Sequence, residues 1–142
     1  MINGGGDDVN DKCGCNACEA VIDELISVDA TTGHLPSPVN QMQQNGNNVV
    51  FVTYPNIAVG AEYGFDECVE EFIDVEYRIN QFAVNTENFW LVLASDVVPT
   101  GEASSFVDNL VHPSTKSIKA IGTTIVERSQ SNESTTSIIP FL

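Results

Sequence analysis

The sequence has few basic side chains, and this scarcity restricts the partners of the protein. Its 142 residues include 5 lysines and arginines against 20 aspartates and glutamates, so the formal net charge is −15. Contacts with the phosphates of a nucleic acid or with an anionic membrane surface would meet like-charge repulsion. We therefore expect neither nucleic acid nor a membrane as a direct partner.

Long apolar runs and familiar catalytic motifs are also missing. No stretch approaches the roughly 18 consecutive apolar residues that a membrane-spanning helix needs. No serine lies in a G-x-S-x-G pattern, the H-E-x-x-H motif is absent, and the only histidines are His34 and His112. The sequence therefore predicts that the protein is not an enzyme.

The first residues lack the basic start and apolar run of a secretory signal. This absence predicts that the chain is made in the cytosol and then becomes part of a larger particle. The composition itself is that of a folded protein, because 42% of the residues are hydrophobic. The length suits one domain.

The two ends of the sequence differ from its middle. Residues 1–12 are rich in glycine and aspartate, which predicts a flexible acidic arm. Residues 13–128 are expected to form a single β-rich domain. Residues 129–142 consist of a polar linker and a strongly apolar end, which either folds back on its own core or adds to a neighbouring subunit.

Most of the middle segment has the composition of β-strands. Residues 72–84 alternate between apolar and polar side chains, as a half-buried strand does, and the turn-like residues 85–88 favour an antiparallel hairpin with the next strand. β-branched and aromatic runs predict the other strands, at residues 49–54, 57–59, 89–93 and 117–127.

Helical spacing of apolar residues is confined to two short segments. It predicts helices over residues 16–28 and 101–111, with a loop over residues 29–48. The predicted fold is mainly β with two short helices: a compact antiparallel β-sandwich or barrel with flexible terminal arms.

Four cysteines are the strongest candidates for a site. Cys13, Cys15 and Cys18 lie within six residues, and Cys68 follows fifty residues after Cys18. Four thiolates can bind zinc or an iron–sulfur cluster, so we predict these residues as metal ligands. Two alternatives stay open, namely a disulfide between Cys68 and one of the first three cysteines, or free buried thiols.

Other residues suggest less specific roles. The acidic residues from Glu62 to Glu76 lack the spacing of a calcium-binding loop, so we expect a solvated strand face. Aromatic residues such as Tyr54 and Trp90 lie in predicted strands and are expected in the core.

These features favour a non-enzymatic structural role over catalysis. We predict an assembly subunit of a virus particle, such as a capsid decoration, connector or tail protein. Its terminal arms would contact copies of itself and other structural subunits. One alternative is a metal-binding or redox module centred on the cysteines, and another is an extracellular filament or adhesin subunit with disulfides.

Overall fold

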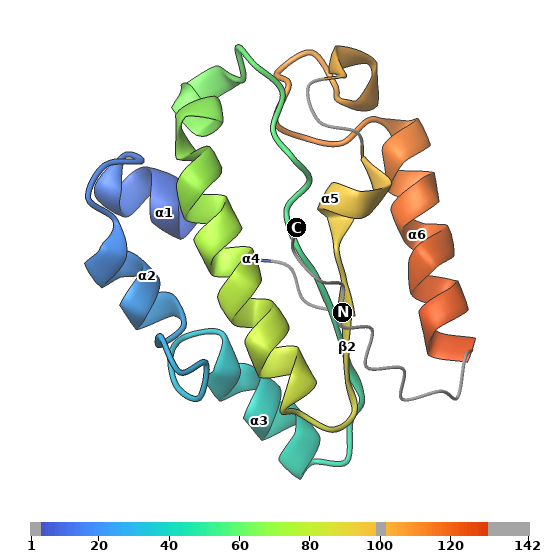
Figure 1. Ribbon diagram of the computed structural model, residues 1–142. Helices are drawn as coiled ribbons and strands as arrows, with labels where there is room; N and C mark the ends of the chain where they lie inside the picture. The colour runs from blue at the N-terminus through green and yellow to red at the C-terminus, as the bar shows by residue number, and fades with distance from the viewer. Residues whose placement is uncertain (1–3, 99–101, 131–142) are drawn as a thin grey trace.

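The computed structural model describes residues 4–98 and 102–130, and over these residues the protein is an α/β structure. Two strands, β1 (Val49–Val52) and β2 (Phe89–Val92), form a parallel sheet. Helices α1 to α4 lie on one side of this sheet, and α6 lies on the other (Figure 1). The predicted antiparallel β-sandwich or barrel is therefore wrong.

Both strands form where β-branched and aromatic residues predicted strands. They pair in parallel, with Val49 opposite Phe89 and Val52 opposite Val92. Parallel strands need a long crossover between them, and here helix α4 (Val69–Val84) lies in that connection. The predicted antiparallel hairpin between residues 72–84 and β2 is therefore wrong.

Residues 72–84 belong to α4 and are not a strand. The residues that α4 buries include Val75, Ile79 and Phe82, which are spaced as the turns of a helix require. Ile73 and Tyr77, apolar members of the apparent alternation, are 57% and 49% exposed. The alternation suggested a strand because Val75 and Ile79 are four residues apart. That spacing fits both the two-residue repeat of a strand and one turn of a helix.

Residues 117–127 form most of α6 (Thr115–Gln130), although they are rich in β-branched side chains. Just before this helix, the Ser114 hydroxyl accepts a hydrogen bond from the Ser117 backbone N–H at 3.5 Å. Ile121 and Ile125, four residues apart, pack against the sheet at Val52 and Val92. Burial of this helical stripe outweighs the weak preference of β-branched residues for strands, so the predicted strand is wrong.

Three short helices precede β1, namely α1 (Gly6–Cys13), α2 (Glu19–Leu25) and α3 (Pro36–Gln44). The prediction of a helix over residues 16–28 is confirmed by α2. The predicted loop over residues 29–48 is wrong, because Pro36 begins α3, a position that proline favours. Residues 6–12, which were expected in a flexible arm, lie in α1, and Val9 is fully buried there.

The remaining elements are short helical segments, and the first of them is kinked at Tyr63 and Gly64. They are η1 (Glu62–Cys68), α5 (Ala94–Val97) and η2 (Ala103–Ser105). Residues 57–59 are not a strand, contrary to the prediction. Of the helix predicted over residues 101–111, the described part contains only the short helix η2. The apolar segment 138–142, on which the predicted assembly role depends, lies outside the described residues.

The main hydrophobic core lies between the sheet and helices α1 to α4. Phe51 and Phe89 from the strands belong to one buried cluster with residues of these helices, among them Val9, Val39 and Phe82. Among the described residues, no helix is both long enough and apolar enough to cross a membrane.

Candidate functional site

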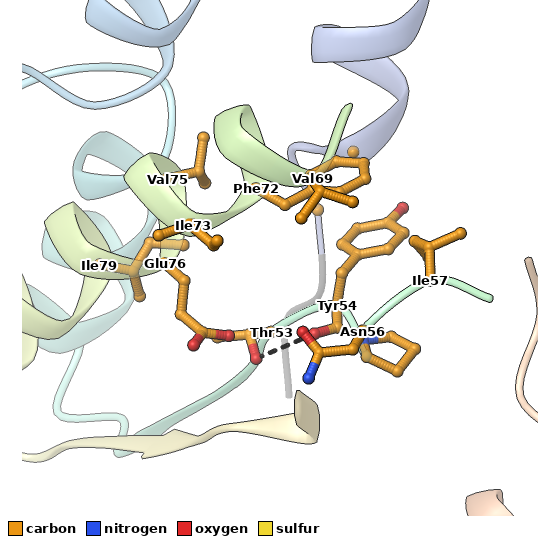
Figure 2. A pocket seen from close by; sticks show the side chains of 13 residues that line it. Thr53, Tyr54, Asn56, Ile57, Val69, Phe72, Ile73, Val75, Glu76 and Ile79 are labelled. Carbon is orange, nitrogen blue, oxygen red and sulfur yellow. Dashed lines mark hydrogen bonds between the residues drawn. The ribbon is translucent and has the colours of Figure 1, made fainter. Parts of the chain in front are cut away.

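A hollow lies at the carboxyl end of β1, between α4 and residues 53–57 (Figure 2). It is a shallow, partly open hollow, and about 540 Å³ of space lies within it when the open solvent at its mouth is counted. Most of its lining is apolar, with Tyr54, Ile57, Val69, Phe72, Ile73, Val75 and Ile79 among the described residues. Ligands of open α/β sheets bind outside the carboxyl ends of the strands, so this hollow is a candidate binding site.

Stacked aromatic rings form one wall of the hollow. The Tyr54 and Phe72 rings are parallel within 1°, with their centroids 5.7 Å apart, and Phe72 stacks in turn on Phe65. Gly6, at the start of α1, lies against the Tyr54 ring, and a Cβ atom at this position would come within 2.5 Å of Tyr54 Cζ. Glycine at position 6 therefore lets α1 approach the wall without displacing Tyr54.

Glu76 brings a carboxylate into this apolar surrounding. The Ser95 hydroxyl donates its one hydrogen to this carboxylate, with Oγ 3.0 Å from Oε2 and 3.2 Å from Oε1. Burial raises the pKa of Glu76, the hydroxyls of Ser95 and Thr53 oppose this rise, and the charge of Asp96 adds to it. Glu76 therefore holds its proton more tightly than an exposed glutamate does.

Thr53 connects the ends of the two strands beneath Glu76. Its hydroxyl oxygen accepts a hydrogen bond from the Ala94 backbone N–H at 3.0 Å, just after β2. Ser95 follows Ala94, so the same short helix α5 holds both Thr53 and the Glu76 carboxylate. The polar side chains that line the hollow thus come from the segment after β1 and from α4, and the segment after β2 supports them from behind.

Arg78 fixes α4 from another side of the helix. This residue is 8% exposed, and Nε and Nη2 donate to the two oxygens of Asp74 at 3.1 and 2.9 Å. Nη1 donates to Asp23 Oδ1 at 2.6 Å and to the backbone oxygen of Ile26 at 2.9 Å. These charge-assisted bonds link α4 to the end of α2 and so help to position Glu76.

The four cysteines predicted as metal ligands are paired in two disulfides. Cys13 is bonded to Cys18 and Cys15 to Cys68, with Cα–Cα distances of 5.3 and 4.6 Å. The alternative in which one of the first three cysteines bonds to Cys68 is the one that the structure contains.

The disulfides change the prediction of a metal site. A sulfur in a disulfide is not a thiolate ligand, and the part of the chain that the structure describes has no group of three or more His, Cys, Asp or Glu able to hold a metal ion. Among the described residues, the four cysteines therefore form disulfides and no metal-binding group is present. Binding of zinc or an iron–sulfur cluster by the reduced cysteines stays a prediction.

The disulfide between Cys15 and Cys68 also bears on the hollow. Cys15 lies in the turn that follows α1, and Cys68 directly precedes Val69, a residue of the lining. The bond therefore joins the chain just after α1 to the chain just before α4, and residues of both helices line the hollow.

His112 lies in the loop between η2 and α6 and is held by Asn109. Asn109 Oδ1 accepts hydrogen bonds from the Val111 and His112 backbone N–H groups, both at 3.1 Å. Asn109 Nδ2 therefore faces His112 Nδ1 at 2.6 Å as the donor, which places the proton of a neutral ring on Nε2. Some hydrolases orient a general base in this way, but no described hydroxyl or thiol is hydrogen-bonded to His112.

The site residues were only partly visible in the sequence. Glu76 belongs to the acidic run expected on a solvated strand face, and Tyr54 was expected in the core. One signal in the sequence could have located this site. The apolar run of the predicted strand ends at Thr53 and Tyr54 before Pro55, and the carboxyl end of a strand is where ligands of open α/β sheets bind. Glu76 carries no such signal, since it lies in a helix from elsewhere in the sequence.

Comparisons with models of protein families, with curated proteins and with solved structures find no match to this chain. A function has to follow from the side chains themselves.

Proposed function

We propose that this protein is a non-enzymatic binding domain that takes a small organic molecule in the hollow at the carboxyl end of β1. The observation that carries the proposal is the position of a mostly apolar hollow at the edge where open α/β sheets bind their ligands. Its few polar groups, from Thr53, Asn56 and Glu76, would orient a ligand held by apolar contacts.

The mouth of the hollow supports entry of such a ligand. Val69 and Ile73 line it and are nevertheless 45% and 57% exposed. A molecule with an apolar body would cover these two side chains, and burial of apolar surface contributes about 25 cal/mol per Å². The stacked Tyr54 and Phe72 rings would supply a rigid wall.

A matched pair of substitutions tests the proposal. Ile73→Ser removes apolar surface at the mouth, and Ile118→Ser removes the same side chain from α6, where Ile118 is 59% exposed. We expect Ile73→Ser to weaken binding of 1-hexanol about threefold to tenfold in calorimetric titrations, while Ile118→Ser leaves it unchanged. Absence of binding to the unaltered protein, or equal effects of the two substitutions, would contradict the proposal.

The non-enzymatic part of the proposal has its own test. His112 is a histidine whose ring is oriented by a hydrogen bond from Asn109, so we take it as the candidate base of any hydrolysis. We expect no turnover of p-nitrophenyl butyrate above the buffer rate. Turnover that disappears in His112→Ala would show an enzyme and overturn this part.

The predicted role as an assembly subunit of a virus particle remains a separate proposal. It depends on the apolar C-terminal segment, and removal of residues 131–142 leaves the whole of α6 in place. We expect oligomers of the full chain in native mass spectrometry and smaller species after this deletion. An identical mass distribution for both chains would contradict the role of this segment.

A further inference from the structure

The lining of the hollow has an electrostatic asymmetry. Among the described residues that line it, Glu76 alone carries a charge, and lysine, arginine and histidine are absent from this set. Within the described part of the chain, the ion pairs join Lys12 to Asp8 and Arg78 to Asp23 and Asp74, so they do not include Glu76. The carboxylate of Glu76 therefore has two hydroxyl neighbours but no counter-ion there.

Charges around the hollow have the same sign as Glu76. Asp7 and Asp8 lie close enough to raise the pKa of Tyr54, after the larger effect of burial, and Asp96 acts on Glu76. The whole chain carries a net charge of −15. This field attracts a cation toward the mouth and repels carboxylate or phosphate ligands.

Apolar and charged groups of the hollow lie at different places. Figure 2 shows the Glu76 carboxylate turned toward Thr53, whereas Tyr54, Phe72 and Val69 gather on the other side. A ligand that matches both parts needs an apolar body at one end and a positive group at the other.

We propose that the ligand is an amphipathic organic cation, an alkyl- or arylammonium, whose ammonium group pairs with the Glu76 carboxylate while its apolar body lies on Val69, Phe72 and Ile73. This inference rests on the proposed function, because it names the class of molecule that the same hollow takes. The ammonium group supplies three donors to a carboxylate that the described residues leave without a positive partner.

Three probes of equal chain length separate the class of ligand from binding itself. Calorimetric titrations of the full chain near pH 8 would use hexylammonium, 1-hexanol and hexanoate. We expect hexylammonium to bind about tenfold more tightly than hexanol, because a hydrogen bond to a charged group contributes more than a neutral one. Hexanoate should bind more weakly than hexanol, because Glu76 repels it.

Two substitutions then assign the preference to Glu76. Glu76→Gln should abolish the preference for hexylammonium over hexanol, because it removes the charge with which the ammonium group pairs. Glu70→Gln removes the same charge from an exposed position on the same helix and should keep the preference. Circular dichroism of both variants checks that they are folded.

The outcomes distinguish the two proposals. Equal affinity for hexylammonium and hexanol, or an unchanged preference in Glu76→Gln, would overturn the cationic ligand and leave a binding hollow in place. Failure of all three probes to bind would overturn the binding domain and the cationic ligand together.

Discussion

The two sides of the sheet differ in how they are stabilised. On the side of α1 to α4, the sheet contacts a continuous buried cluster, and two disulfides and the bonds of Arg78 join the helices to one another. On the other side, α6 reaches Val52 and Val92 through Ile121 and Ile125, which are only partly buried. The candidate site uses the more strongly connected side, so its walls are held in place before a ligand arrives.

The largest expected effect is on the buried cluster. Phe51 is 1% exposed and packs on Phe89, with ring centroids 6.2 Å apart. Phe51→Ala should lower the free energy of unfolding by about 3–5 kcal/mol, because it leaves a cavity among residues that cannot all close in. Urea unfolding followed by circular dichroism measures this loss, and a change near zero would show that this side is not the main core.

The two disulfides should contribute different amounts of stability, according to the length of the loop that each one closes. Cys15 and Cys68 are 53 residues apart, whereas Cys13 and Cys18 are 5 apart. Loop-closure entropy gives about 4 kcal/mol for the long loop and about 2 kcal/mol for the short one. We expect the pair Cys15→Ser and Cys68→Ser to lower stability more than the pair Cys13→Ser and Cys18→Ser in urea unfolding.

Thiol titration of the denatured, unreduced protein checks the pairing itself. No free thiol is expected, and four would mean that neither disulfide forms. Disulfides persist in oxidising compartments, so four free thiols would also support the predicted cytosolic origin. Zinc titration of the reduced chain tests whether the cysteines then act as ligands.

The α6 side should tolerate substitution better. Ile125→Ala removes a partly buried contact with the sheet, so we expect a loss of about 1–2 kcal/mol, below the range for a fully buried side chain. Urea unfolding under the conditions used for Phe51→Ala measures it. A loss equal to that of Phe51→Ala would mean that the two sides contribute equally.

The smallest expected effect is the pH dependence of stability that Glu76 causes, and it tests whether this side chain is buried in the hollow. Because burial raises the pKa of Glu76, the folded protein holds this proton more tightly than the unfolded chain does. The stability from the neutral carboxyl is complete below the ordinary glutamate pKa of about 4.3 and is lost as pH rises through the raised value. Glu76→Gln cannot ionise and should therefore gain stability relative to the unaltered protein as pH rises.

Thermal unfolding at several pH values between about 4 and 8 measures this difference. Glu70→Gln, on the exposed side of the helix, controls for the loss of one negative charge. A difference between Glu76→Gln and the unaltered protein that stays constant with pH would show that Glu76 titrates as an exposed glutamate.

Sequence patterns predicted the strands of the sheet better than its helices. The runs that contain Phe51 and Leu91 have few residues that suit another structure, so β1 and β2 form where expected. Residues 72–84 and 117–127 satisfy strand and helix patterns together. Their conformation depends on which side chains find a partner on the sheet, and a local pattern does not contain that information.

Only the part of the candidate site that follows β1 could be predicted from the sequence. The end of a strand at Thr53 and Tyr54 can be located from the sequence. Glu76 joins these residues because α4 lies beside β1, and Ser95 joins them because β2 is parallel to β1.

By itself, the sequence determined the acidic charge, the positions of the two strands, the helical segment within residues 16–28 and the candidate pairing of Cys68 with an earlier cysteine. Only the tertiary structure decided that the strands are parallel, that two ambiguous segments are helices and that Glu76 faces an apolar hollow. The physical reason is that charge and strand preference are properties of neighbouring residues, whereas burial is a property of contacts between segments far apart in the chain.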